Sequence, residues 1–228
     1  MNTAIIVAAG TGSRFAASHP KQFIELLGKP IIIHTLERFE TCPAVDEIIL
    51  VLSVDGCREF ANLGGHQAIT KLRVITTGGN TRAESVRNGL NRVNAETAAV
   101  IAVHDGARPL VSVDEITRTI EKAAETGAAC LVAEVTDTVK EVKGDKIAGT
   151  LDRKTLRRAL TPQAFEYETL QWAFDTAELG EEVTDECYLV EKMGIEISIV
   201  EGSSRNIKIT RQDDLALAAA YLSGEIKG

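Results

Sequence analysis

The sequence predicts an α/β fold built on a doubly wound, mostly parallel sheet. Apolar, β-branched runs alternate with segments of helical periodicity, which is the order expected of βαβ units with right-handed crossovers. The runs IIV, IILVL and VIAV are apolar throughout, as in strands that are covered on both faces. One stretch near residue 140 breaks this rhythm. These observations predict a Rossmann-like sheet with a projecting β-hairpin arm.

The expected elements follow the chain in order. The predicted strands are Ala4–Val7, Glu47–Leu52, Leu72–Thr76, Val100–Val103, Ala128–Ala133 and Glu196–Val200. The predicted helices are Pro30–Phe39, Asp55–Asn62, Thr81–Val93, Val113–Glu125, Tyr167–Leu179, Thr184–Met193 and Gln212–Leu222. The segment Thr136–Leu151 shows rough polar–apolar alternation around a Lys143-Gly144-Asp145-Lys146 turn, which predicts a hairpin. Because this hairpin has little of its own to bury, we expect it to project and to pair with a second subunit.

Length and composition narrow the class of protein. With 228 residues the chain has the size of one α/β domain, and we expect a single domain over 1–228 with a dimerisation arm at about 134–153. A net charge of −8 argues against nucleic acid as a partner, because backbone phosphates bind to basic surfaces. The widely spaced cysteines Cys42, Cys57, Cys130 and Cys187 favour reduced thiols in the cytoplasm. We see no targeting or transmembrane segment.

A glycine-rich turn, AAGTGSRF, follows the first strand and indicates phosphate binding. The dinucleotide fingerprint needs a glycine five residues after Gly10, where this chain has Phe15. The phosphate loop of ATP-hydrolysing enzymes needs Gly-Lys-Ser or Gly-Lys-Thr, which is absent. What remains is a turn whose amides can face an anion, with Arg14 and, further on, Lys21 as cations. A plain strand-to-helix turn with solvated cations is the alternative for this segment alone.

Three further stretches contain polar residues where predicted strands end. GGNTRAESV opens a helix at Thr81, HDGARP places Asp105 just past a strand, and SRNIKIT contains Lys208. Taken singly, each could be a helix cap, an Asx turn or a surface strand. Together they supply glycine-rich backbone, one acid and the cations Arg14, Lys21, Arg108 and Lys208. Such a set suits phosphoryl or nucleotidyl transfer, in which catalysis is mainly positioning and charge neutralisation.

Eight motifs in order show what the chain resembles. They are AAGTGSR, PKQ, GGNTRAESV, HDGARP, DTVK, DR with LTPQ, TDE and NIKIT, and they extend over nearly the whole chain. The sequence resembles the 2-C-methyl-D-erythritol 4-phosphate cytidylyltransferases of the non-mevalonate isoprenoid route. The resemblance implies transfer of CMP from CTP to methylerythritol 4-phosphate, with release of pyrophosphate. It also implies a direct in-line attack of the acceptor phosphate on the α-phosphate of CTP, without a covalent enzyme intermediate.

The resemblance also implies roles for individual residues. Arg14 and Lys21 would stabilise the transition state, where charge gathers on the α-phosphate. The residues implied in CTP binding are Ala8, Ala9, Gly10, Thr11, Gly12, Gly79, Asn80, Ser85, Asp105 and Gly106. Asp105 would also bind Mg²⁺ or another divalent cation, and Arg205 stands where some relatives have an additional acid. The residues implied in acceptor binding are Arg108, Thr138, Arg153, Thr161, Thr184 and Lys208.

The resemblance also implies a function for the predicted arm. In the family, the positions of Thr138 and Arg153 lie on or beside an arm that reaches into the neighbouring subunit's site. The chain is therefore expected to act as a homodimer with exchanged arms. Two other functions remain open at this stage. A ribitol 5-phosphate cytidylyltransferase would share the fold and the arginine–lysine pair, and a non-catalytic nucleotide-binding module would need neither these cations nor Arg153.

Overall fold

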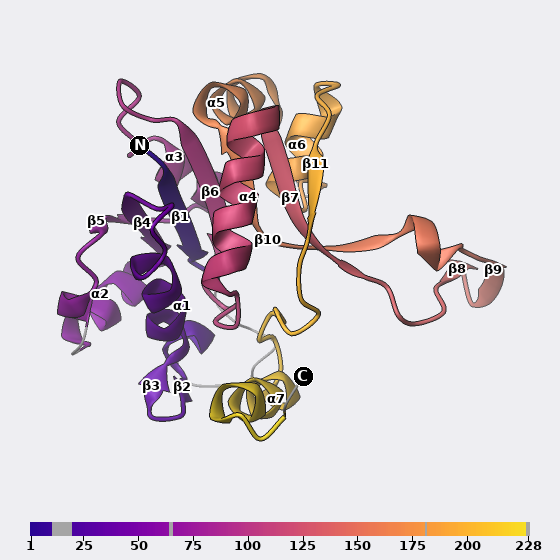
Figure 1. The fold of residues 1–228 in the computed structure, drawn as a ribbon, viewed down its shortest axis with the longest axis horizontal. Helices are drawn as coiled ribbons and strands as arrows, with labels where there is room; N and C mark the ends of the chain where they lie inside the picture. Colours follow the sequence, from indigo (N-terminus) through magenta and orange to yellow (C-terminus); the bar gives the residue numbers. More distant parts are fainter. Residues whose placement is uncertain (11–19, 64–65, 181, 227–228) are drawn as a thin grey trace.

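The structure is a computed structural model that describes residues 1–10, 20–63, 66–180 and 182–226. Its centre is a seven-stranded sheet in the order β11-β7-β10-β6-β1-β4-β5 (Figure 1). The strands are β1 (Thr3–Ala8), β4 (Glu47–Leu52), β5 (Leu72–Thr77), β6 (Val100–Asp105), β7 (Ala128–Glu134), β10 (Arg157–Glu166) and β11 (Ser198–Glu201). All neighbours pair in parallel except β10, which is antiparallel to both β6 and β7. The predicted mostly parallel α/β sheet is therefore confirmed.

Helices cover both faces of this sheet. On one face lie α1 (Ile31–Glu40), α2 (Val54–Asn62) and α4 (Val113–Thr126), and on the other lie α3 (Arg82–Leu90), α5 (Tyr167–Thr176) and α6 (Glu186–Lys192). Strand β1 shows how the sequence produces two cores. Ala4 and Ile6 pack into the first core and Ile5 into the second, because successive side chains of a strand point to opposite faces.

The strand β10 was missed by the sequence analysis. It lies between β6 and β7 in the middle of the sheet, although it contains Pro162 and begins with Arg157 and Arg158. Proline cannot donate to a ladder, so a proline in a run argues against a central strand. Here the pairing with β7 is interrupted between Ala159 and Gln163, and Pro162 lies in this irregular part. The break in the ladder removes the need for a donor at that position.

Other boundaries shift by a few residues. The strand β6 extends to Asp105, so this residue ends the strand and does not follow it. The helix α6 begins at Glu186, two residues later than predicted, because the Asp185 side chain accepts a hydrogen bond from the backbone N–H of Tyr188 and caps the helix. The last predicted strand begins at Ser198 rather than Glu196. These shifts leave the order of the elements unchanged.

The predicted hairpin is present and projects from the body of the molecule (Figure 1). It consists of β8 (Lys140–Lys143) and β9 (Lys146–Thr150), joined at Gly144 and Asp145. Gly144 has a φ of +63°, a conformation that glycine adopts without steric cost. Val142 and Ile147 are 68% and 66% exposed, so the hairpin offers apolar side chains to solvent.

A smaller layer at the carboxyl edge involves the end of the chain. Helix α7 (Gln212–Ser223) packs near β2 (Glu25–Leu26) and β3 (Lys29–Pro30), around buried Leu26, Ile31, Ile209 and Ala218. The remaining short elements are the 3-10 turns η2 (Lys21–Phe23), η3 (His66–Ala68) and η4 (Arg153–Thr155). Within the described ranges, none of the helices has the length and apolar character needed to cross a membrane.

Candidate active site

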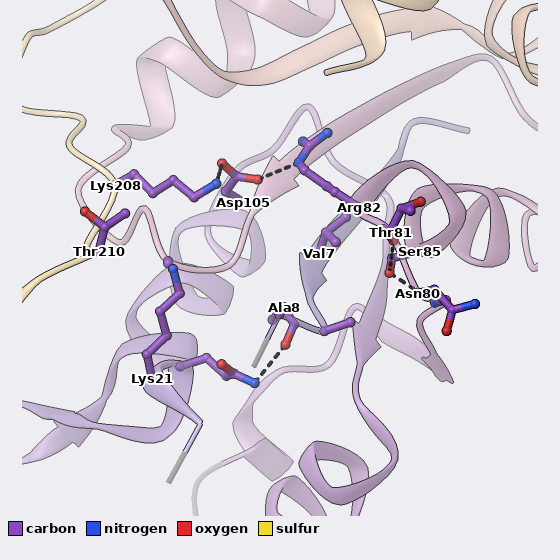
Figure 2. A pocket seen from close by; sticks show the side chains of 15 residues that line it. Val7, Ala8, Lys21, Asn80, Thr81, Arg82, Ser85, Asp105, Lys208 and Thr210 are labelled. Atoms are coloured by element: carbon purple, nitrogen blue, oxygen red, sulfur yellow. Dashed lines mark hydrogen bonds and ion pairs between the residues drawn. The ribbon is translucent and has the colours of Figure 1, made fainter. Parts of the chain in front are cut away.

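A cavity of about 380 Å³ opens where β1 and β6 end (Figure 2). Open α/β sheets bind ligands at this carboxyl edge, and the volume lies in the usual range for small-molecule sites. Nine of the residues implied in function line it, namely Ala8, Ala9, Gly10, Lys21, Gly79, Asn80, Ser85, Asp105 and Lys208. The cavity therefore brings together residues from five separate motifs.

Asp105 is the acidic centre of this cavity. Its Oδ1 accepts a hydrogen bond from Arg82 Nε at 3.1 Å, and its Oδ2 lies 2.8 Å from Lys208 Nζ and 3.5 Å from Arg108 Nε. Burial alone would raise the pKa of Asp105, but attraction to Arg82, Lys208 and Arg108 outweighs burial and holds this pKa well below its usual range. The carboxylate is therefore ionised at every physiological pH, and three cations surround it.

Arg82 is a site residue that the sequence analysis did not select. It is the first residue of α3, inside the motif GGNTRAESV, and it lines the cavity. Burial would lower its pKa, yet attraction to Glu186 and Asp105 raises the pKa above its ordinary value. The motif gave a signal, because it placed an arginine one residue after the helix cap Thr81. Its partner Glu186 lies about 100 residues away in the sequence, so the Arg82–Glu186 ion pair could not be predicted from a local pattern.

The loop before α3 closes tightly on the loop after β1. A Cβ built on Gly78 would lie 2.4 Å from the Cβ of Ala9, and one on Gly79 would lie 2.4 Å from the Cβ of Glu84. Only glycine fits at such distances. Gly78 therefore lets the two loops approach each other, and Gly79 lets its own loop pack against the first turn of α3. The hydroxyl of Ser85 accepts a hydrogen bond from Gly79 N at 3.1 Å. This side of the cavity is thus built largely from fixed backbone.

Capping holds the same loop in place. Thr81 and Glu84 form a reciprocal capping box at the start of α3. Glu84 Oε2 also accepts a hydrogen bond from the backbone N–H of Asn80 at 2.6 Å. The Asn80 side chain, at the edge of the cavity, is consequently carried on a backbone that the Glu84 carboxylate holds in place (Figure 2).

Lys21 approaches the cavity from the side opposite to Asn80 (Figure 2). Its Nζ donates a hydrogen bond to the carbonyl of Ile209 at 3.2 Å. The neighbouring Gln22 is buried, and its Nε2 donates to the carbonyl of Ala8 at 2.8 Å. This bond ties the turn that contains Lys21 to the end of β1. Lys21 and Lys208 therefore place two ammonium groups on the same side of the cavity as Asp105.

A closed ring of hydrogen bonds lies behind Asp105. His104 Nε2 donates to the carbonyl of Arg108, Arg108 Nη1 to that of Asn206, and Asn206 Nδ2 to that of Thr161. The Thr161 hydroxyl completes the ring at His104 Nδ1 and also accepts from the backbone N–H of Asp105. Burial lowers the pKa of His104 to about 3, so the imidazole is neutral and can accept this bond. The ring fixes the backbone that carries Asp105.

The remaining residues implied in function lie around this centre. Gly106 donates its N–H to the carbonyl of Val7, and a Cβ there would lie 2.8 Å from Ala8. Thr138, Arg153 and Thr184 are exposed and do not line the cavity in this chain, and Arg153 Nη1 donates to the carbonyl of Thr136 at the base of the arm. Thr11, Gly12 and Arg14 lie outside the described residues. Their roles stay predictions.

The fold and this cavity define a class of protein. Glycine-lined backbone, an ionised aspartate and converging lysines at the carboxyl edge of an α/β sheet are the arrangement of a nucleotidyltransferase. The sequence model of the 2-C-methyl-D-erythritol 4-phosphate cytidylyltransferase family matches residues 2–224. The chain belongs to this family.

Individual relatives agree with the family assignment. The enzymes of that name from Syntrophus aciditrophicus and Bacillus velezensis are each 43% identical, over 97% of this chain and 96% and 95% of their own lengths. The crystal structure of the Francisella tularensis enzyme is similar with a TM-score of 0.79 at 34% identity, and each chain is covered to 99%. A 4-diphosphocytidyl-2C-methyl-D-erythritol synthase from Anaerococcus prevotii gives a TM-score of 0.85 at 28% identity, covering 98% of this chain and 96% of its own.

Proposed function

We propose a division of roles among the residues of this cavity for the reaction of the family. The chain is a cytidylyltransferase: it transfers the CMP group of CTP to 2-C-methyl-D-erythritol 4-phosphate in isoprenoid biosynthesis. A new P–O bond forms between the acceptor phosphate and the α-phosphorus, the bond to the β-phosphate breaks, and pyrophosphate leaves. The observation that carries the proposal is the convergence of Lys21, Lys208 and Asp105 on one cavity lined by glycine backbone.

The nucleotide would occupy the side formed by the two closely packed loops. Backbone N–H groups of Ala8–Gly10 can face the triphosphate, because glycine turns leave such amides unshielded. Gly79, Asn80 and Ser85 would contact the cytosine, with the base held against a backbone that is already fixed by the capping box. A narrow pocket made of backbone discriminates by size, which favours a pyrimidine over a purine.

Lys21 would act on the transition state. In an in-line transfer the α-phosphorus is approached by a phosphate that is itself negatively charged, so the barrier is largely electrostatic. The bond from Lys21 Nζ to the Ile209 carbonyl holds the ammonium group in place at the cavity. A fixed cation of this kind stabilises the pentavalent phosphorus more than the separate ground-state anions. Arg14 is expected to share this role.

A divalent cation such as Mg²⁺ fits the acidic centre as a substrate-borne ion. The described residues contain no group of three or more metal-binding side chains, so a site made only of protein is not found there. Mg²⁺ often binds through one carboxylate together with substrate phosphates and water. Asp105 is ionised, and among the described residues its Oδ1 accepts a bond from Arg82 alone, so one position for such a ligand exists. The ion would neutralise charge on the triphosphate.

The acceptor would be bound partly by a second copy of the chain. The arm is exposed, carries apolar Val142 and Ile147, and has Arg153 at its base, where the family places acceptor-binding residues. In a homodimer with exchanged arms, Thr138 and Arg153 of one subunit would reach the site of the other. Arg108, Thr161, Thr184 and Lys208 would contribute from the subunit that holds CTP. We place this enzyme in the cytoplasm, because its four cysteines are free thiols.

Release of pyrophosphate tests the function directly. The purified protein is incubated with CTP, Mg²⁺ and either methylerythritol 4-phosphate or ribitol 5-phosphate. We expect rapid release with the first acceptor, much slower release with the second, and none when Mg²⁺ is chelated. Faster turnover of ribitol 5-phosphate would overturn the acceptor assignment, and release without Mg²⁺ would overturn the role of Asp105. Sedimentation of the same samples tests the homodimer.

A further inference from the structure

A buried ion pair joins the two halves of the cavity. Arg82 Nη1 donates to Glu186 Oε1 at 2.6 Å, while Nε of the same guanidinium donates to Asp105 Oδ1 at 3.1 Å. The side chain of Glu186 is completely buried. One planar cation thus contacts two carboxylates, one in the cavity and one behind it.

Each partner stands at the start of a helix that serves a different substrate. Arg82 begins α3, directly after the loop of Gly79 and Asn80 on the nucleotide side. Glu186 begins α6, two residues after Thr184, to which we assign the acceptor side. The backbone N–H of Glu186 donates to Gln163 Oε1 at 3.1 Å, so this helix start is also fixed to β10. The Arg82–Glu186 contact therefore links the two helix starts directly.

The pair has bonding capacity that it does not use. Arg82 Nη2 and Glu186 Oε2 are buried, and neither has a hydrogen-bond partner in the described part of the chain. A guanidinium and a carboxylate can form two parallel hydrogen bonds, and such bidentate pairs are stronger and more directional than single contacts. In this structure Arg82 divides its donors between two acids. A second arrangement, bidentate on Glu186, is available to it.

We infer that Arg82 and Glu186 are positioning residues that couple nucleotide binding to acceptor binding. When the nucleotide engages Asp105, Arg82 releases the Oδ1 of Asp105 and pairs with Glu186 through both Nη atoms. The start of α6 and the Thr184 turn are then held in the geometry that receives the acceptor. This inference rests on the proposed function, since it assigns the two sides of the cavity to CTP and to the acceptor phosphate.

Glu47 and Arg73 provide a matched control at the opposite edge of the sheet. Glu47 is also a largely buried glutamate that is ion-paired to an arginine, and it accepts a further bond from Thr3 Oγ1 at 2.9 Å. It lies at the amino end of β4, away from the cavity. Glu47→Gln therefore makes the same chemical change in a comparable pair without touching either substrate side.

Calorimetric titration of the acceptor measures the coupling. The full-length protein with Mg²⁺ is titrated with methylerythritol 4-phosphate, alone and saturated with α,β-methylene-CTP, whose bridging carbon prevents release of pyrophosphate. We expect the nucleotide analogue to tighten acceptor binding at least about fivefold, a common scale for coupling between sites. In Glu186→Gln and in Arg82→Lys the ratio should fall towards one, because neither variant can form the bidentate pair. In Glu47→Gln it should be unchanged.

The outcomes separate this inference from the function on which it rests. A ratio near one in the unaltered protein, or a full ratio in Glu186→Gln or Arg82→Lys, overturns the coupling. Loss of the ratio in Glu47→Gln as well would show a general effect of instability and would also overturn it. If Glu186→Gln does not fold, the unaltered protein and Arg82→Lys decide the question. Failure of the proposed function is seen independently, as absence of pyrophosphate release by the unaltered protein with both substrates.

Discussion

The two edges of the central sheet treat buried charge differently. At the amino edge, Glu47 has Arg73 as its cation and Thr3 as a further donor, and both of its carboxylate oxygens are occupied. At the carboxyl edge, Asp105 has three cationic neighbours. Arg82 and Glu186 beside it each keep a buried polar atom without a partner among the described residues.

This difference separates stabilising charge from charge that awaits a ligand. An ion pair whose polar atoms are all hydrogen-bonded by neighbouring residues contributes to folding and leaves no group for a ligand. At the carboxyl edge, the two acids Asp105 and Glu186 face three cations, which leaves a surplus of positive charge. Such a surplus is an unfavourable arrangement until an anion arrives. The charges at the carboxyl edge therefore favour binding of a phosphate-rich substrate, whereas the Glu47–Arg73 pair at the amino edge is already balanced.

Two lysines that each donate to a backbone carbonyl give the sharpest test. Lys21 donates to Ile209 O at the carboxyl edge, and Lys71 donates to Cys42 O at the amino edge. Lys21→Ala should lower kcat by about 10²-fold or more, the scale for losing one electrostatic contact to a transition state. Lys71→Ala should leave kcat unchanged. Steady-state pyrophosphate release measures both, and equal kcat values in the two variants would refute the contrast.

Stability against pH tests the neutral histidine behind Asp105. The pKa of His104 is about 3 in the folded chain and near 6.5 when unfolded, so the unfolded state binds more protons between these values. Its contribution is fully present above pH 6.5 and is lost as the pH falls towards 3. We expect the unaltered protein to lose about 2 kcal/mol more than His104→Gln between pH 7.5 and 4.5. Urea unfolding at both pH values measures this, and parallel losses would show that His104 is not buried as a neutral group.

Arg153 extends the comparison to the arm. We expect Arg153→Ala to raise the KM for the acceptor by about tenfold, which is the loss of one hydrogen bond to a charged group, with little change in the KM for CTP. Arg157→Ala is a suitable control, because Arg157 is exposed and pairs with Glu201 at the edge strand β11. A change confined to the KM for CTP would show that the arm does not serve the acceptor.

The smallest effect is expected at the amino edge itself. Glu47→Gln should lower the free energy of unfolding by only about 1 kcal/mol, because Arg73 is partly exposed and water replaces much of its interaction. It should leave kcat and both KM values unchanged. Thermal or urea unfolding combined with the pyrophosphate assay measures this variant. A kinetic defect larger than its stability loss would mean that the amino edge also takes part in catalysis.

The class of fold, the order of the elements and most of the cavity residues could be predicted from patterns along the chain. Buried strands and helix caps are local patterns, so β1, β4, β6 and the start of α3 could be predicted from neighbouring residues. The hairpin was equally visible, because its turn and its alternation lie within sixteen residues. Residues next to glycine turns at strand ends, such as Asp105 and Asn80, could be selected for the same reason.

Which of these residues contact one another depends on the three-dimensional arrangement of distant segments. The place of β10 between β6 and β7 depends on pairing across the sheet. Its Pro162 argues against a central strand when only the local sequence is considered. That placement brings Thr161 to His104 and Gln163 to the start of α6. The contact of Arg82 with both Asp105 and Glu186 joins residues 23 and 104 positions apart. Electrostatic coupling depends on distance in space and on burial, and neither quantity is contained in the spacing of residues along the chain.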